Sequence, residues 1–166
     1  MSNAPTKEQL QSLKLVAFDI DGVFTDGRFY LADDGTESKA FHTQDGYGIR
    51  CLIRSGRQVA VISGRRSGAV ERRMNELGVQ HVVLGCSDKV AAFDKLVDGI
   101  GADLAETAYT GDDIPDLPLL KHAGIAFAVG NAVADVKAAC DYTTAAGGGF
   151  GAVREICDLI VGADDS

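Results

Sequence analysis

Six short apolar runs, rich in β-branched residues, alternate along this chain with segments whose apolar residues recur at helical spacing. The strand candidates are residues 13–19, 59–63, 79–84, 106–111, 125–129 and 141–144. The helix candidates are residues 45–56, 67–77, 89–100, 115–123, 132–140 and 151–161. This alternation predicts a doubly wound, Rossmann-like α/β fold, in which a parallel sheet is covered by helices on both faces.

The domain organisation follows from the few segments that break this rhythm. Residues 27–41 form two apolar runs around Asp-Asp-Gly, which predicts a β-hairpin inserted after the first strand. The polar segment 1–12 is expected to be disordered and tag-like, and residues 13–166 to form one domain. The glycine-rich stretch 147–152 reads as a flexible connector in a C-terminal tail. It fits a dinucleotide-binding fingerprint, but too few residues follow it for the required βαβ unit.

Composition excludes several classes of function. With 46% hydrophobic and 24% charged residues, the chain is typical of a globular domain. It has no apolar run long enough to span a membrane and no signal-peptide pattern at its start, so we expect a cytoplasmic protein. A net charge of −8 disfavours nucleic acid as a partner. The four cysteines and three histidines show no spacing typical of a zinc site or a disulfide framework.

Carboxylates gather where the predicted strands end. Asp19 and Asp21 close the first strand, and their spacing places both side chains on one side of it. Asp112 and Asp113 follow the fourth strand, with Asp116 one turn further on. Ligands of open α/β sheets bind beyond the carboxyl ends of the strands, so we expect these side chains to converge. Hard oxygen ligands without histidine or thiolate favour Mg²⁺.

A hydroxyl and an ammonium group belong to the same predicted edge. Ser63 closes the second strand, Gly64 offers a backbone N–H, and Lys89 begins the helix that leads to the fourth strand. These three groups suit the binding of phosphoryl oxygens. An aspartate beside the metal can attack phosphorus, while a second carboxylic acid protonates the leaving oxygen and then activates water. The combination predicts a phosphomonoester hydrolase that uses an aspartyl-phosphate.

Each of these motifs alone also fits a plainer structural explanation. D-x-D and SGR suit ordinary turns, Lys89 suits a solvated helix start, and GDDIPD suits a capped loop. An EF-hand calcium loop at DIDGVFTDG is excluded because Val23 occupies the third ligand position. The functional interpretation depends on the order of all four motifs and on their positions at strand ends.

The strings FDIDG, SGR, Lys89 and GDDIPD resemble the four ordered motifs of the haloacid dehalogenase-like phosphohydrolases. The resemblance implies that Asp19 is the nucleophile and Asp21 the general acid/base. It implies that Asp19, the backbone carbonyl of Asp21 and Asp112 bind Mg²⁺, and that Ser63 and Lys89 bind phosphate. Two further carboxylates, those of Asp113 and Asp116, would support or complete the set of metal ligands.

Longer strings narrow the resemblance. DGVFTDGRFY, FHTQDGYGIRCL, SGRRS and GAVREICDL resemble the 3-deoxy-D-manno-octulosonate 8-phosphate phosphatases of lipopolysaccharide precursor biosynthesis. The resemblance implies a homotetramer. The stretches between successive motifs leave no room for a lid domain, so a capless enzyme is expected. Three alternatives stay open: a phosphatase for a nine-carbon ulosonate phosphate, a non-catalytic oligomerisation module, and a receiver domain.

The tail of this chain differs at one position from the pattern seen in these phosphatases. Phe150 in GGFGAVRE stands where an arginine is common. An arginine there could pair with a sugar carboxylate, which phenylalanine cannot do. We therefore expect Phe150 to cover the site as an apolar group, and Arg65 or Arg66 to supply the carboxylate contact.

Overall fold

A six-stranded parallel sheet forms the centre of the protein in a computed structural model, which describes residues 4–165. The strand order is β5-β4-β1-β6-β7-β8. The strands are β1 (Leu15–Phe18), β4 (Gln58–Ile62), β5 (His81–Val83), β6 (Thr107–Gly111), β7 (Ile125–Ala128) and β8 (Tyr142–Thr143). All six predicted strands are confirmed. The four residues of β1 are fully buried, as expected for a strand covered on both faces.

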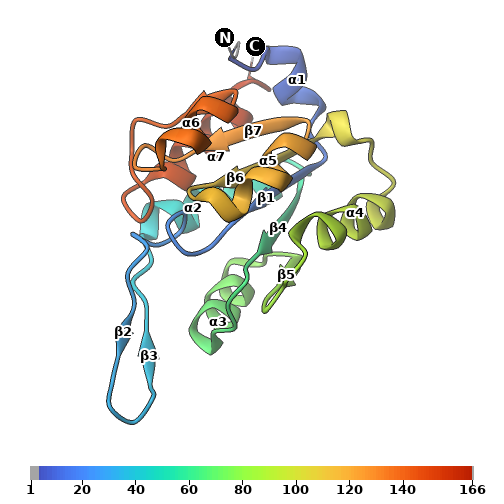
Figure 1. The fold of residues 1–166 in the computed structure, drawn as a ribbon. Helices are drawn as coiled ribbons and strands as arrows, with labels where there is room; N and C mark the ends of the chain where they lie inside the picture. Colours follow the sequence, from blue (N-terminus) through green and yellow to red (C-terminus); the bar gives the residue numbers. More distant parts are fainter. Residues whose placement is uncertain (1–3, 166) are drawn as a thin grey trace.

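Helices cover both faces of the sheet (Figure 1). The helices after the hairpin are α2 (Thr43–Arg54), α3 (Gly68–Leu77), α4 (Lys89–Ile100), α5 (Leu117–His122), α6 (Ala134–Ala139) and α7 (Ala152–Gly162). Two short 3₁₀ helices are η1 (Leu104–Glu106) and η2 (Ile114–Asp116). Helices α2 and α7 pack closely on one face, whereas α4, α5 and α6 lie together on the other. The doubly wound α/β prediction is confirmed. No helix within residues 4–165 is long and apolar enough to cross a membrane.

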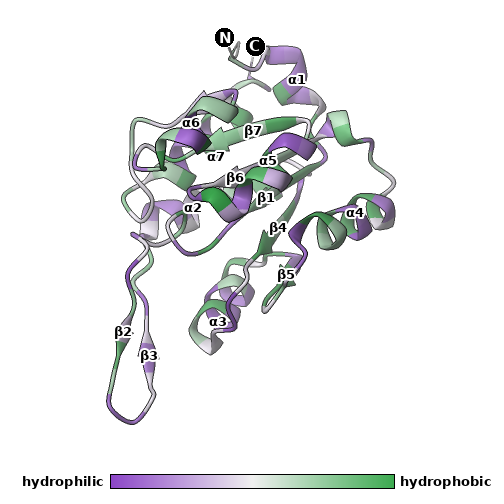
Figure 2. Ribbon diagram, in the orientation of Figure 1, coloured by the Kyte–Doolittle hydropathy of each residue, from purple (hydrophilic) through white to green (hydrophobic). Residues whose placement is uncertain are grey.

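The predicted hairpin is present and projects away from the sheet (Figure 1). It pairs β2 (Tyr30–Leu31) with β3 (Glu37–Ser38) in antiparallel register. Gly35 turns the chain with φ of +85°, a value that favours glycine. Figure 2 shows apolar residues concentrated on the strands of the main sheet, while the hairpin carries both polar and apolar residues.

The expectation of disorder over residues 1–12 is wrong for the part that the structure describes. Helix α1 (Lys7–Ser12) begins with a capping box. The Gln9 backbone N–H donates to the Thr6 hydroxyl oxygen, and the Thr6 backbone N–H donates to the Gln9 side-chain oxygen. Leu10 is buried in the core. Its helix is further fixed because the Gln11 side chain donates to the backbone oxygen of Ala163 at 2.8 Å.

The glycine-rich stretch near the end was expected to be a flexible connector, and its contacts correct this expectation. The Gly148 backbone N–H donates to Asn131 Oδ1 at 2.8 Å, and that of Gly149 donates to the Val23 carbonyl at 3.2 Å. A Cβ atom on Gly148 would collide with the carbonyl of Gly22. The stretch is therefore packed against the loop that follows β1, and the buried helix α7 comes directly after it.

Candidate active site

The site lies beside the central strand, where the strand order reverses. Strand β1 pairs with β4 on one side and with β6 on the other, and Phe18 is opposite Thr110. The Asp19 backbone N–H extends this ladder by donating to the Thr110 carbonyl at 3.0 Å. Asp19 therefore leaves β1 at the carboxyl edge, next to the loop that follows β6. This is the topological switch point at which open α/β sheets bind ligands.

Three carboxylates meet at this edge. Asp19, Asp112 and Asp116 each offer an oxygen, and these oxygens lie within 4.8 Å of one another. They line a cavity of about 250 Å³. The other lining residues are Asp21, Gly27, Asp113 and Pro115. The sequence argument for convergence thus holds for the segments after β1 and β6.

Two of these carboxyl groups resist ionisation in the absence of a cation. Burial, and then the charge of Asp116, raise the pKa of Asp19 to about 7. Burial and the neighbouring Asp19 raise the pKa of Asp112 to about 7. The Asp112 side chain accepts no hydrogen bond from residues 4–165. A hard divalent cation would offset this repulsion, so the carboxylate donor set fits Mg²⁺.

Lys89 compensates part of the negative charge. Its ammonium lies 3.1 Å from Asp19 Oδ1 and 2.9 Å from Asp116 Oδ1. Burial alone would lower the pKa of Lys89, but these two carboxylates raise it above its ordinary value. Burial opposes ionisation of Asp116, yet the charge and hydrogen bond of Lys89 hold its pKa below the usual range. At neutral pH Lys89 is a cation and Asp116 an anion.

Tyr109 was missed by the sequence argument. Its buried hydroxyl donates to Asp116 Oδ1 at 2.7 Å and accepts from Lys89 at 3.2 Å. The second oxygen of Asp116 accepts from the backbone N–H of Asp112 at 3.0 Å. Through these hydrogen bonds, Asp116 orients both Lys89 and the loop that carries Asp112. The only signal in the sequence was a tyrosine inside an otherwise small-residue strand, which is equally typical of core packing.

Glycine at position 22 is required by the close approach of two loops. A Cβ atom there would collide with the Asp112 carboxylate, and the residue has a φ of +85°. The Thr25 hydroxyl accepts hydrogen bonds from the backbone N–H groups of Gly22 and Gly27. This turn brings Asp21 and the start of the hairpin to the rim of the cavity.

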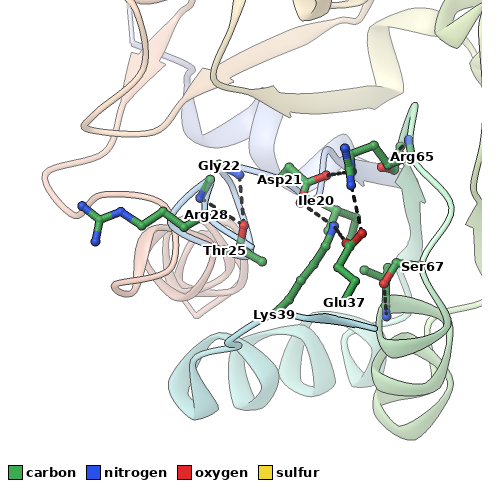
Figure 3. Close-up of polar contacts among 12 residues, drawn as sticks. Ile20, Asp21, Gly22, Thr25, Arg28, Glu37, Lys39, Arg65 and Ser67 are labelled. Atoms are coloured by element: carbon green, nitrogen blue, oxygen red, sulfur yellow. Dashed lines mark hydrogen bonds and ion pairs between the residues drawn. The ribbon is translucent and has the colours of Figure 1, made fainter. Parts of the chain in front are cut away.

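Asp21 lies apart from the three clustered carboxylates. Its Oδ1 accepts a hydrogen bond of 2.6 Å from Lys39 at the base of the hairpin (Figure 3). Arg65 approaches Asp21 Oδ2 at 4.0 Å and binds Glu37 at 2.9 Å. Neither Lys39 nor Glu37 was singled out in the sequence, because the spacing of the hairpin residues says nothing about where the return strand meets the core.

Ser63 and Gly64 follow β4, the strand next to β1, at the same edge of the sheet. Ser63 is buried, and its Oγ accepts from the Arg65 backbone N–H at 3.3 Å. No hydrogen bond joins the Ser63 side chain to the carboxylate cluster within the described part of the chain. The structure places Ser63 near the site without a direct link to Asp19.

The remaining sequence-predicted residues lie at different distances from the carboxylate cluster. Asp113 lines the cavity and caps η2 by accepting from the Ile114 backbone N–H at 2.8 Å. Arg65 lies beside Asp21, whereas Arg66 packs over Gly85 in the loop after β5. Phe150 is 69% exposed, on the segment packed against the loop after β1.

Comparison with known proteins identifies the family. The profile of the haloacid dehalogenase-like hydrolases matches residues 85–147. The 3-deoxy-D-manno-octulosonate 8-phosphate phosphatase of Yersinia pestis is 42% identical over 158 residues, which cover 95% of this chain and 84% of the relative. The chain belongs to this phosphatase family. The family resemblance seen in the four motifs is thereby confirmed.

Solved structures of the 3-deoxy-D-manno-octulosonate 8-phosphate phosphatase family share the fold. The Moraxella catarrhalis enzyme, solved with a magnesium ion, a phosphate ion and a KDO molecule, aligns with a TM-score of 0.92 and 43% identity. The alignment covers 95% of this chain and 90% of that one. The cobalt-bound Haemophilus influenzae enzyme aligns with a TM-score of 0.91 and 41% identity, and covers 95% and 92% of the two chains.

Proposed function

We propose that this protein is a Mg²⁺-dependent phosphatase that hydrolyses 3-deoxy-D-manno-octulosonate 8-phosphate. The observation that carries the proposal is the cluster of Asp19, Asp112 and Asp116 with Lys89 at the switch point, in a chain 42% identical to a phosphatase with this substrate in its name. A cytoplasmic location and a place in lipopolysaccharide precursor biosynthesis are part of this proposal.

In the first chemical step, Asp19 acts as the nucleophile. Its Oδ1 is held by the Ile20 backbone N–H at 2.8 Å and by Lys89 at 3.1 Å. Its Oδ2 accepts no hydrogen bond within residues 4–165 and is available for attack on phosphorus. The new O–P bond forms as the bond between phosphorus and the sugar oxygen breaks, and Asp21, in its protonated form, donates its proton to the leaving sugar oxygen.

In the second step, water hydrolyses the aspartyl-phosphate. Asp21 is now a carboxylate and takes a proton from the attacking water, whose oxygen bonds to phosphorus. The bond between phosphorus and Asp19 breaks, which returns the Asp19 carboxylate and releases inorganic phosphate. Lys89, Ser63 and the Gly64 backbone N–H would bind the phosphoryl oxygens throughout and offset their charge.

Asp19, the backbone carbonyl of Asp21 and Asp112 would hold the metal, and Asp113 and Asp116 would support them. When bound, Mg²⁺ supplies charge neutralisation at the phosphoryl oxygens. Asp116 already gives both its oxygens to other groups, namely Lys89, Tyr109 and the backbone after β6. Its part is therefore to orient the neighbouring ligands.

For substrate specificity, we infer that Arg65 contacts the sugar carboxylate and that Phe150 supplies apolar cover. Arg65 lies beside Asp21 and its side chain is 48% exposed, which supports this role. A contact between Arg66 and the sugar carboxylate has less support, because Arg66 packs over Gly85. Arg65→Ala should reduce kcat/KM for the sugar phosphate more than for a small aryl phosphate, and Phe150→Ala should raise KM for the sugar phosphate.

A homotetramer that uses the hairpin for assembly is also part of the proposal. Tyr30 and Leu31 are 70% and 67% exposed on a two-stranded sheet, and such an isolated hairpin is marginal in water. Pairing with hairpins of other subunits would cover these side chains. Light scattering coupled to gel filtration tests this directly, and a monomer at micromolar concentration would contradict it.

The function itself is tested by kcat/KM over a panel of phosphomonoesters with Mg²⁺, because specificity lies in that ratio. The panel contains 3-deoxy-D-manno-octulosonate 8-phosphate, a nine-carbon ulosonate 9-phosphate and p-nitrophenyl phosphate. We expect the eight-carbon sugar to give the highest value. A higher value for the nine-carbon sugar would reassign the substrate, and no turnover of any member would favour a non-catalytic module.

A further inference from the structure

The base of the hairpin carries a buried ammonium group that the phosphatase chemistry above does not use. The Lys39 side chain is only 1% exposed, although the neighbouring residues Ser38 and Ala40 are exposed. Burying an ammonium is costly unless it is paired. Its partner is Asp21 Oδ1, at 2.6 Å. A buried lysine on an otherwise exposed hairpin indicates that its ion pair with Asp21 has a specific role.

Asp21 is held from its other side as well. Arg65 Nε lies 4.0 Å from Asp21 Oδ2, and Glu37 bridges the two cations, with one oxygen 3.4 Å from Lys39 and the other 2.9 Å from Arg65. The Arg65 guanidinium is itself fixed over the Phe29 ring, 4.3 Å from its centre. In Figure 3 the four charged side chains alternate in sign around a closed ring.

The ring joins three segments that are separate in the sequence. Asp21 comes from the loop after β1, Arg65 from the loop after β4, and Glu37 and Lys39 from the return strand of the hairpin. Two of the three segments already carry residues assigned to catalysis or phosphate binding. The hairpin supplies the third side of the ring, so the position of the Asp21 carboxylate depends on how the hairpin base is seated.

We propose that Lys39 is a positioning residue for Asp21. It holds the carboxyl group in the orientation from which a proton passes to the leaving oxygen in the first step and is taken from water in the second. The proposal rests on the proposed function. Lys39 pairs with Asp21 and Glu37, and within residues 4–165 no hydrogen bond or ion pair joins it to Asp19, Asp112 or Asp116, so its effect on turnover passes through Asp21.

Lys39→Met tests this role because methionine keeps the length and apolar body of the side chain and removes the charge. We expect kcat for the sugar phosphate to fall about 10- to 100-fold, since a displacement of about 1 Å at a reacting group has effects of that size. KM and the Mg²⁺ concentration for half-maximal activity should change little. Lys39→Arg should recover part of kcat, because arginine restores the charge.

A double-mutant cycle distinguishes positioning from general loss of structure. In an Asp21→Asn background, measured under single-turnover conditions, Lys39→Met should cause no further loss of rate. A merely structural defect would reduce the rate by the same factor in both backgrounds. Lys14→Met is the matched control, because Lys14 forms a 2.9 Å ion pair with Glu106 far from the site, and its kcat should match the wild type.

The leaving group provides an independent readout. A p-nitrophenolate ion leaves without a proton, so Lys39→Met should slow the phosphorylation step less for p-nitrophenyl phosphate than for the sugar phosphate. A wild-type kcat in Lys39→Met, or an equal loss in the Asp21→Asn background, would overturn the positioning role and leave the proposed function standing. A wild-type protein without phosphatase activity would instead overturn both.

Discussion

Folding raises the pKa of the two site carboxyl groups Asp19 and Asp112. Without a metal ion, the pKa of each is about 7, because of burial first and then of neighbouring carboxylates, whereas an aspartate in an unfolded chain titrates near 4. The folded state thus binds these protons more tightly than the unfolded state. The two groups leave stability unchanged below about pH 4 and reduce it progressively as the pH rises to about 7.

Removing one of these charges should stabilise the metal-free protein at high pH. In EDTA at pH 8, Asp112→Asn should raise the free energy of unfolding by about 1 to 3 kcal/mol, because a buried carboxylate is removed. At pH 4.5 the gain should largely vanish. Urea unfolding at both pH values measures this, with Asp113→Asn as the neighbouring control. An equal effect of Asp112→Asn at the two pH values would show that its charge is not the cause.

The same charges link magnesium binding to pH. Mg²⁺ competes with the protons on Asp19 and Asp112, so the Mg²⁺ concentration for half-maximal activity should rise as the pH falls below about 7. Asp112→Ala should raise that concentration at every pH because a charged ligand is lost. EDTA should abolish turnover and excess Mg²⁺ should restore it. Full activity in the chelator would contradict a metal-dependent mechanism.

The two aspartates after β1 should differ in the step that they support. Asp19→Asn should abolish turnover, because an amide oxygen does not form the phosphoenzyme. Asp21→Asn should still form it slowly but lose about 10² to 10⁴ in rate, the usual worth of general acid–base assistance. Rapid-quench measurement of acid-precipitated phosphoprotein separates the two variants. Wild-type kcat in a contaminant-free Asp19→Asn preparation would end the mechanism.

Among the elements, the glycine-rich segment before α7 has a direct connection to the site. A Cβ on Gly148 would meet the Gly22 carbonyl and lie 2.9 Å from the Thr25 carbonyl. Gly148→Ala should therefore shift the loop that carries Asp21 and reduce kcat about tenfold or more. Gly99→Ala in α4 is the control, since nothing lies within 4 Å of a Cβ there and alanine favours helix. Equal kinetics for the two variants would show that the loop accommodates the methyl group.

Helix α7 is part of the core and not a removable tail. Its inward residues Val153, Ile156 and Ile160 are fully buried. Its N-terminus is capped from another element, because Asp45 in α2 accepts from the Arg154 backbone N–H at 3.0 Å. Functional tests of the glycine-rich segment therefore require point substitutions, since truncation before α7 would remove part of the core.

At the scale of the whole molecule, Arg57 ties together both ends of the described chain. Its side chain is 5% exposed and donates to both oxygens of Asp164, at 2.6 and 2.9 Å. It also donates to the Leu10 carbonyl at 3.2 Å. The hydrogen bonds from Arg57 hold the pKa of Asp164 below its usual range, against a smaller effect of burial.

Arg57→Leu should lower the free energy of unfolding by about 1 to 3 kcal/mol, because hydrogen bonds to charged groups are lost and Leu10 loses a partner. The loss should be full at neutral pH and begin to shrink as the pH falls below about 4, where the unfolded state binds a proton at Asp164 before the folded state does. It should vanish only below the lowered pKa that Asp164 has in the folded state. Thermal unfolding of Arg57→Leu and Asp164→Asn at pH 7 and pH 3.5 tests this. Arg54→Leu, at the exposed end of α2, is the control.

The strands and most helices were predictable because their signals are local. Strand β1 is a continuous apolar run and α4 has apolar residues at helical spacing, so burial and periodicity agree. Helix α1 was missed although Thr6 and Gln9 form a capping box, because six residues of polar composition give little periodicity. Its helix depends on Arg57 and Ala163, which are distant in sequence.

By itself, the sequence determined the doubly wound fold and the meeting of Asp19 with Asp112, since parallel strands send their carboxyl ends to one edge. Only the tertiary structure decided that Tyr109 and Asp116 hold Lys89, that Gly148 packs on Gly22, and that Lys39 reaches Asp21. The physical reason is separation along the sequence, because hydrophobic periodicity and strand ends depend on neighbouring residues. Hydrogen bonds and close backbone contacts join residues whose proximity exists only after the chain has packed.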